Sequence, residues 1–201
     1  RPLPERSVDV AAREFGRVAG ALLASPDKNL RERTIELVAT LQSKALEGQL
    51  VELFRDIKEP TSVRSEALRT LGVLKAVDLP KLVEQGLNDD KVTVRTEARK
   101  ILTTLDPEAA LPILSDVIDN GTTPERQDAV RLLGGLASPK VDDVISRLLD
   151  SLAEGKLPPA VRLDVRLAAG LRESTAIKEK LVAWESKRSS ITDIVERYAD
   201  S

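Results

Sequence analysis

Residues 63–74 read VRSEALRTLGVL, and this stretch decides the fold because similar segments recur along the chain. The related segments are LRERTIELVATL at 30–41, VRTEARKILTTL at 94–105, ERQDAVRLLGGL at 125–136 and VRLDVRLAAGLR at 161–172. Their leading arginines lie 33, 31, 31 and 36 residues apart. A period of this length is typical of repeat proteins, in which each unit buries its apolar face against its neighbours.

Each segment has the apolar spacing of an amphipathic helix. In 63–74, Val63, Ala67, Leu71 and Leu74 are separated by four, four and three residues, which places them on one helical face. Eight residues after the leading arginine the side chain is small in every segment: Ala39, Gly72, Thr103, Gly134 and Gly170. Because glycine inside a helix costs about 1 kcal/mol relative to alanine, these glycines predict the close approach of a neighbouring helix.

A second apolar stripe follows each segment and predicts a second helix. In the first repeat this stripe consists of Leu50, Leu53, Phe54 and Ile57. No segment alternates apolar and polar residues as a strand does. The sequence therefore predicts an all-α fold, a right-handed α-solenoid of about five stacked helix pairs with capping helices. We expect an N-terminal capping helix in 1–26, repeats at about 27–59, 60–90, 91–122, 123–157 and 158–188, and a C-terminal helix or linker at 189–201.

The composition excludes several kinds of chemistry. The chain has 201 residues, a formal net charge of -2, no cysteine and no histidine. Disulfides, thiolate nucleophiles, imidazole bases and His/Cys metal sites are therefore impossible within it. The adjacent carboxylates Asp89-Asp90 and Asp142-Asp143 lie in a turn and in the first turn of a helix, and they suggest neither an acid/base pair nor a calcium site. We expect no catalytic residue, no metal and no cofactor.

No apolar run is long enough to span a membrane, because about 18 residues would be needed. The chain starts with Arg1-Pro2 and contains no methionine, which indicates a fragment of a longer protein.

The leading arginines form the most regular polar pattern, here called the arginine column: Arg31, Arg64, Arg95, Arg126 and Arg162. The structural interpretation is that each arginine opens its helix and binds carboxylates or carbonyls at the turns between repeats. Asp27 and Asp90 lie close before two of them. The functional alternative is a row of anion-binding sites.

Two further columns, here called the mixed-charge columns, follow the arginines. Basic side chains lie five residues after the arginine, at Arg69, Lys100 and Arg131, and Glu36 and Leu167 interrupt this column at its ends. Acidic side chains lie two residues after the arginine, at Glu66, Glu97, Asp128 and Asp164. The i,i+3 pairs contribute at most about 0.5 kcal/mol each, so one interpretation is a solvated, self-neutralised surface.

The alternative interpretation of these columns is a partner site. Helices pack about 10 Å apart and an extended peptide advances about 3.3 Å per residue. A peptide of alternating charge would therefore meet one basic residue about every third position. Nucleic-acid binding through phosphates is a further alternative, but it needs a net basic groove and aromatic side chains. Trp184 ends the last apolar stripe. We interpret it as a packed terminal residue rather than as a platform for a ligand.

The pattern Val-Arg-x-x-Ala-x-x-x-Leu-Gly-x-Leu at 63–74, with Leu-Pro-x-Leu at 79–82 and 111–114, resembles HEAT repeats of the PBS-lyase HEAT-like variety. The resemblance covers about residues 27–187. It implies an armadillo-like scaffold that binds proteins or peptide segments, with the arginine-bearing helices on the concave side of an arc.

A narrower resemblance concerns the C-terminal part. LPPAVRLD at 157–164 and LVAWE at 181–185 look like the end of a HEAT-like region in certain large bacterial proteins, where it follows a propeller-type dehydrogenase-like domain and precedes a c-type haem domain. This resemblance implies an architectural segment of an extracytoplasmic protein. Our leading hypothesis is a monomeric, non-catalytic interaction or spacer module within a larger protein.

Overall fold

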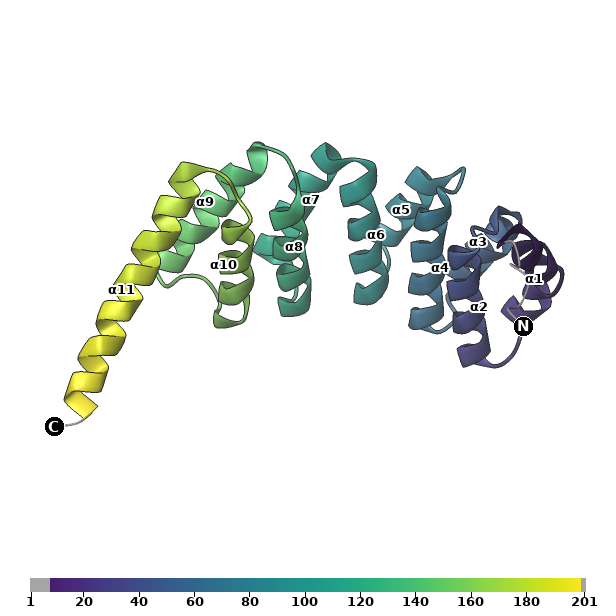
Figure 1. The fold of residues 1–201 in the computed structure, drawn as a ribbon, viewed down its shortest axis with the longest axis horizontal. Coiled ribbons are helices and arrows are strands. Elements are labelled where there is room, and N and C mark those ends of the chain that lie inside the picture. The colour runs from purple at the N-terminus through teal and green to yellow at the C-terminus, as the bar shows by residue number, and fades with distance from the viewer. Residues whose placement is uncertain (1–7, 200–201) are drawn as a thin grey trace, which may run out of the picture. The chain divides into compact units, whose positions relative to one another are not determined.

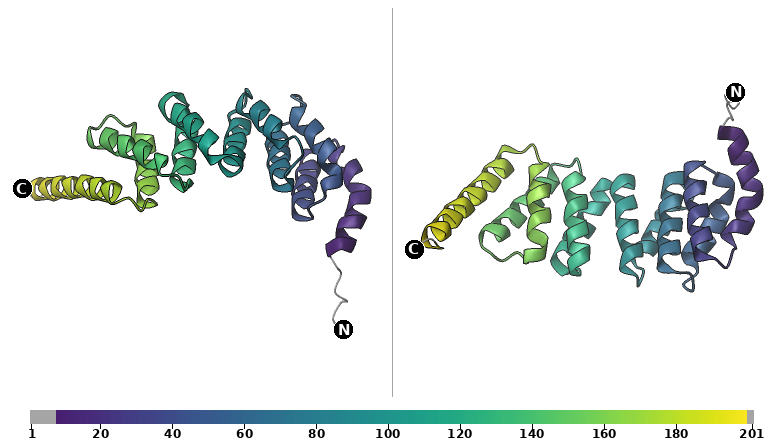
Figure 2. Two further views of the ribbon diagram at one scale, coloured as in Figure 1. Left: turned by 90° about the horizontal axis from the view of Figure 1, so that it is seen from above. Right: turned by 60° about the horizontal axis from the view of Figure 1, so that its bottom comes forward.

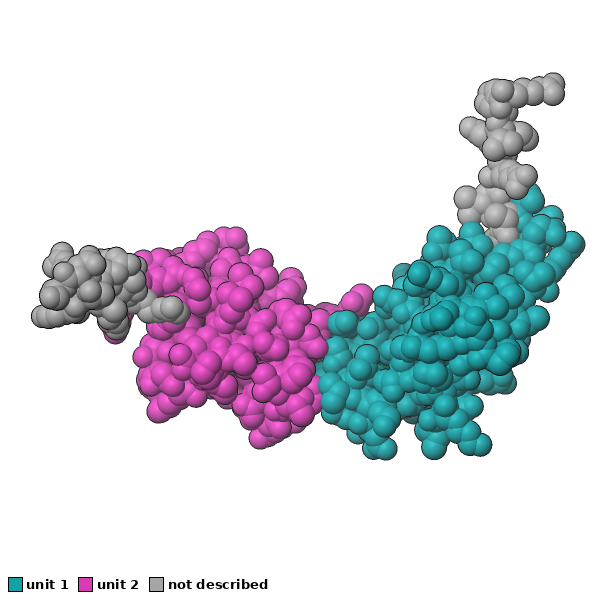
Figure 3. Space-filling model, turned by 90° about the horizontal axis from the view of Figure 1, so that it is seen from below, with its two compact units in different colours: residues 1–101 teal, residues 102–201 magenta. Residues whose placement is uncertain are grey.

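The computed structural model describes residues 8–199, with the side chains of residue 10 and residues 13–187. The chain divides into two compact units, residues 1–101 and 102–201 (Figure 3). Over residues 8–199 the secondary structure consists of eleven α-helices and two short 3-10 helices, without a strand. The predicted all-α class is therefore confirmed. None of the described helices is long and apolar enough to cross a membrane.

The helices follow one another in pairs. In unit 1 they are α1 (Val8–Leu23), α2 (Lys28–Thr40), η1 (Lys44–Leu46), α3 (Glu47–Arg55), α4 (Thr61–Leu74) and α5 (Leu79–Leu87), and α6 (Val92–Leu105) ends just inside unit 2. Unit 2 continues with α7 (Pro107–Asn120), α8 (Thr123–Gly135), α9 (Lys140–Ala153), η2 (Pro159–Val161), α10 (Arg162–Gly170) and α11 (Thr175–Ala199). The five arginine-led segments correspond to α2, α4, α6, α8 and α10.

Within each unit, the first helices of neighbouring pairs lie side by side. Helix α4 packs against α2 and α3 in unit 1, and α8 packs against α7 and α10 in unit 2 (Figures 1 and 2). The apolar faces predicted from the sequence fill the space between them. Val63, Ala67 and Leu71 of α4 are completely buried, as are Ala129 and Leu133 of α8. Burying such side chains stabilises the fold by about 25 cal/mol per Å² of apolar surface.

Ile57 corrects one detail of the predicted core. Helix α3 ends at Arg55, two residues earlier than the apolar stripe suggested, and Ile57 is 82% exposed. The carboxylate of Asp56 accepts a hydrogen bond from the backbone N–H of Lys58, which closes a turn at this point. Local turn chemistry of this kind competes with helix continuation.

Two departures from the repeat pattern have structural explanations. Glu125 occupies a column that is apolar elsewhere and is buried, but its Oε2 accepts hydrogen bonds from the backbone N–H and the hydroxyl of Thr122, which caps α8. Arg172 occupies a leucine column and donates to Asp142 and to the carbonyls of Leu136 and Ser138. It therefore satisfies the carbonyls of the C-cap residue of α8 and of the loop that follows it, where helices leave acceptors unpaired.

The C-terminal segment is part of a longer helix. Helix α11 runs unbroken from Thr175 to Ala199, so the C-terminal helix expected at the end of the chain is the last part of α11. The sequence from 185 to 190 holds neither glycine nor proline to interrupt it.

The column of small residues marks close contacts between first helices. A Cβ added to Gly134 would lie 2.8 Å from the Cβ and 2.9 Å from the Cα of Ala168 on α10. At Gly72 the added Cβ would lie 3.1 Å from Cγ1 of Ile101 on α6. Among the described residues, an added Cβ at Gly170 meets no atom within 4 Å. The glycines thus permit close packing at two of the three positions.

We expect Gly134→Ala to lower the free energy of unfolding by about 1–3 kcal/mol, because the new methyl group would overlap the backbone of α10. At Gly72 the neighbouring atoms belong to the flexible side chain of Ile101, which can move aside for a methyl group. The larger substitution Gly72→Leu is therefore needed there, and it should lower the free energy of unfolding by the same amount. Chemical denaturation of the purified chain measures both effects.

Gly135→Ala is the matched control for this prediction. It is adjacent in sequence and also helical, but an added Cβ there meets no described atom within 4 Å. The stability of this variant should be unchanged or slightly raised by the better helix propensity of alanine. Equal stabilities of the Gly134 and Gly135 variants, within about 0.5 kcal/mol, would contradict the packing role of the column.

Candidate partner-binding site

The arginine column lies at the turns that join the repeats. Arg126 donates from Nε to the carbonyl of Gly121 at 2.7 Å and from Nη2 to that of Asp119 at 2.9 Å. Arg162 donates from Nε to the carbonyl of Leu157 at 3.0 Å. In both cases the guanidinium binds backbone oxygens of the turn that precedes its own helix, and Arg126 also reaches the last turn of α7. The chain leaves a second helix and enters the next first helix at these turns, so the arginines hold the crossing in place.

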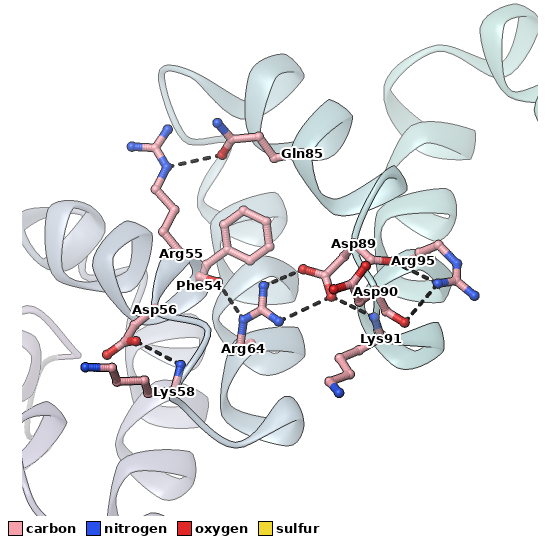
Figure 4. A network of polar contacts seen from close by, with 10 residues as sticks. All are labelled: Phe54, Arg55, Asp56, Lys58, Arg64, Gln85, Asp89, Asp90, Lys91 and Arg95. Carbon is pink, nitrogen blue, oxygen red and sulfur yellow. Dashed lines mark hydrogen bonds and ion pairs between the residues drawn. The ribbon is translucent and has the colours of Figure 1, made fainter.

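Two members of the column also bind carboxylates of the following turn. Arg64 forms a two-pronged ion pair with Asp89, whose Oδ1 lies 3.2 Å from Nη1, and its Nε donates to the carbonyl of Phe54 at 3.0 Å (Figure 4). Nη2 of Arg31 lies 3.0 Å from Oε2 of Glu59. Each carboxylate comes from the turn that leads into the next repeat. One guanidinium therefore connects two successive turns.

The carboxylates that lie closest in sequence have other roles. Asp27, suggested as a partner of Arg31, accepts a hydrogen bond from the N–H of Asn29 at 2.8 Å and caps α2. Asp90 contributes its backbone carbonyl to Arg95 at 3.1 Å (Figure 4). The distance in sequence from the arginine does not predict these roles of Asp27 and Asp90, because the stacking of repeats decides which turn a guanidinium reaches.

The environment of Asp89 shifts its titration. Burial raises the pKa of this carboxyl, but the hydrogen bond from Arg64, the N–H of Lys91 and the charges of Arg64 and Arg95 outweigh that effect and hold the pKa below its usual value. The charged form of Asp89 is therefore stabilised in the folded state.

The mixed-charge columns of unit 1 lie on neighbouring first helices. Arg69 is paired with Glu66 on α4, and Nζ of Lys100 lies 3.5 Å from Oε2 of Glu97 on α6. The hydrogen bond to Glu66 raises the pKa of Arg69, burial lowers it, and the charges of Glu66, Glu97 and Glu36 raise it further. Carboxylates from α2, α4 and α6 therefore act on one guanidinium.

In unit 2 the same columns are linked between repeats. Arg131 of α8 pairs with Asp128 on its own helix at 2.9 Å and with Asp164 of α10 at 3.2 Å. The second pair was not anticipated from the sequence. The signal for it is the recurrence of an acidic residue two positions after Arg162, because side-by-side first helices bring this position next to the basic column of the preceding repeat.

Trp184 is packed against a charged neighbour. The guanidinium carbon of Arg166 lies 5.3 Å from the centre of the indole ring, and Nη2 of Arg166 lies 2.9 Å from Oε1 of Glu185. This arrangement supports the interpretation of Trp184 as a packed residue. An open hollow between α1 and α3, lined by Gly20, Gln49 and Glu52 among others, was not anticipated from the sequence.

The side chains of the arginine column and of the mixed-charge columns can bind a partner through hydrogen bonds and ion pairs. Within the described part of the chain, no three His, Cys, Asp or Glu side chains cluster in a way that could hold a metal ion. The mixed-charge columns remain the candidate site for a protein partner, and the arginine column remains a candidate structural element.

We predict that Asp89→Asn lowers the free energy of unfolding by about 1.5–3 kcal/mol at neutral pH, because charge-assisted bonds from Arg64 are weakened. The folded-state pKa of Asp89 lies below the unfolded value of about 3.9, so its contribution is present above that value. It is lost as the pH falls through the folded-state pKa. Chemical denaturation between about pH 2 and pH 7 should therefore show the variant and the unmodified chain converging in acid.

Asp90→Asn is the matched control, because Asp90 enters the network through its backbone carbonyl. It should keep the pH dependence of the unmodified chain. A gap between the Asp89 variant and the unmodified chain that stays constant from neutral pH into acid would contradict this account of Asp89.

Comparison with known proteins found similar solved structures and one family model. Human deoxyhypusine hydroxylase in complex with glycerol is similar over 92% of this chain and 91% of that chain, at 14% sequence identity and a TM-score of 0.39. A likeness at this level is too low to transfer an activity. No curated protein matches the sequence.

The family model for HEAT repeats matches residues 49–134. This range includes α4 to α7 and nearly all of α8, and it contains three members of the arginine column, Arg64, Arg95 and Arg126. The matched region and the pairwise packing of the helices agree with the resemblance drawn from the Val-Arg-x-x-Ala pattern. Residues 49–134 match the family of HEAT repeats, and the prediction of a HEAT-like helical repeat fold is confirmed.

Proposed function

We propose that this chain is a non-catalytic interaction module that binds a protein segment through its mixed-charge columns. One observation carries the proposal: in each of the three i,i+3 pairs the cation is much more exposed than its carboxylate. The side chains of Arg69, Lys100 and Arg131 are 51–57% exposed, whereas Glu66, Glu97 and Asp128 are 15–28% exposed. A partner therefore meets the cations first.

The exposure pattern favours a partner with spaced carboxylates. Each exposed guanidinium or ammonium group can accept one further carboxylate, because it offers several N–H donors. The recessed carboxylates repel a continuous run of acidic residues. A segment that alternates acidic with basic or neutral residues avoids this repulsion and is the best match to the columns.

Other roles receive less support from the same contacts. Binding to nucleic acid draws its affinity from a net positive surface that follows the phosphates, and each i,i+3 pair of these columns carries one positive and one negative charge. A catalytic role would require activated nucleophiles or acid/base groups, and the sequence has neither histidine nor cysteine. The architectural role in a haem-bearing extracytoplasmic protein stays a prediction, which a Cys-x-x-Cys-His motif downstream in the full reading frame would support.

We expect simultaneous replacement of Arg69, Lys100 and Arg131 by glutamate to abolish partner binding, since the exposed charge changes sign at all three positions. The partner is first recovered by pull-down with the intact chain, and its affinity is then measured at about 0.15 M salt. The replacement of the same residues by glutamine tests the site without added repulsion and should weaken binding. Circular dichroism checks that helicity is retained.

A control variant carries the same change of charge elsewhere. Arg17, Lys81 and Arg147 are at least half exposed and lie on α1, α5 and α9. Their replacement by glutamate should leave the affinity within about twofold of the unmodified chain. If both triple variants bind equally well, the mixed-charge columns are solvated surface, and the partner site lies on the second helices, at the repeat edges or near Trp184.

A further inference from the structure

Helix α10 and its C-cap residue, Leu171, expose a row of leucines. Leu163, Leu167 and Leu171 are 59%, 58% and 66% exposed, and each follows the previous one by four residues. This spacing places them on one face, over a length of about 12 Å. Leucines this exposed are unremarkable one at a time, but a contiguous apolar row on a surface helix indicates an interaction site.

The row is a particular feature of α10 and is not required by the repeat. One, five and nine residues after the leading arginine, the other repeats carry mostly polar side chains or glycine: Glu32, Glu36 and Thr40; Ser65, Arg69 and Val73; Thr96, Lys100 and Thr104; Gln127, Arg131 and Gly135. The buried face of α10 is formed by other residues, Val165, Ala168 and Ala169. The three leucines therefore stand where the preceding repeats carry mostly polar residues.

Guanidinium groups border the leucines on both sides. Arg131 of α8 is held beside α10 by its ion pair with Asp164, the residue next to Leu163. The side chain of Arg131 is 57% exposed and that of Asp164 only 13%. On the side facing α11, Arg166 pairs with Glu185, and the exposed fractions of the two side chains, 38% and 45%, are similar. Arg131 is therefore the cation that is much more exposed than its carboxylate, and an acidic group on a partner is its complement.

The apolar area indicates the size of the partner element. The three leucines expose on the order of 300 Å², a patch of the size that is often functional on monomeric proteins. A stable dimer buries about 800 Å² on each partner, so the row is too small to hold two copies of this chain together. It matches one face of a short helix, which presents apolar residues at intervals of three and four.

We infer that α10, together with Arg131, is a docking site for an acidic amphipathic helix of a partner protein. Apolar residues of that helix pack along Leu163, Leu167 and Leu171, and a carboxylate on its flank pairs with Arg131. This inference rests on the proposed interaction function and adds the kind of partner element to it. It places the apolar anchor of the interaction in unit 2.

The test is a selection from a random peptide library on the full chain, with the Leu163→Ser/Leu167→Ser/Leu171→Ser variant as the counter-target. Enriched peptides should carry apolar residues three and four positions apart, flanked by acidic ones. In fluorescence anisotropy the strongest peptide should bind the leucine variant at least about tenfold more weakly. Arg131→Gln should weaken binding about threefold to tenfold and reduce its dependence on salt.

Control variants make the result specific. Leu37, Ile57 and Val73 are exposed apolar residues of unit 1, and their replacement by serine should leave peptide affinity unchanged. Arg17→Glu with Lys81→Glu should also leave it unchanged.

If Arg69→Glu with Lys100→Glu loses the full-length partner while the leucine variant keeps it, the proposed function stands and the inference about α10 is wrong. If the leucine variant loses the partner while Arg69→Glu with Lys100→Glu keeps it, the α10 site stands and the charged residues of unit 1 are not the site.

Other outcomes would overturn the inference directly. These are enriched peptides that bind the leucine variant equally well, a selection without enrichment, and a dimer of the unmodified chain in sedimentation that the leucine variant abolishes. Circular dichroism establishes that the leucine variant is folded. If it is not, Leu167→Glu alone replaces it, because a carboxylate in the middle of the row should repel an acidic helix and lower its affinity to the same extent.

Discussion

The guanidinium of Arg64 shows the interaction on which the rest of the structure depends. It binds the carbonyl of Phe54 in the last turn of α3 and the carboxylate of Asp89 in the turn after the second helix of its pair. A buried charge of this kind is favourable only with full hydrogen bonding, and the end of α3 and the turn after α5 supply that bonding here. The contacts fix where α4 begins and which turn lies beside it, so the register of the following repeat is set as well.

Stacking in a fixed register gives the surface its order. Because first helices lie side by side within each unit, residues at the same position in successive repeats become neighbours in space. Gly134 allows α10 to approach α8, and the same approach brings Asp164 to Arg131. The close packing of α8 against α10 therefore also determines which charged side chains meet on the surface. In unit 2, the row of exposed leucines on α10 lies next to these charged residues.

The sequence predicts the helical class, the positions of the five first helices and the close contacts at Gly72 and Gly134, because all of these depend on local periodicity and side-chain size. It does not predict that Glu59 and Asp89 are the partners of Arg31 and Arg64, since those contacts depend on how repeats stack. The sequence pattern wrongly predicts that Ile57 belongs to the core, because a local turn ends helix α3 before this residue. Leu167 appears in the sequence as an interruption of a basic column, and only its exposure shows an apolar surface. The mixed-charge columns are visible in the sequence, but the greater exposure of their cations is not.

The central claim is that the first helices of the repeats carry the partner site. Hydrogen–deuterium exchange with mass spectrometry, on the chain alone and with the partner recovered by pull-down, tests it most directly. The account predicts that binding slows exchange in peptides from α4, α6, α8 and α10, and leaves α5, α7 and α9 unchanged. Slower exchange confined to α5, α7 and α9 would contradict it.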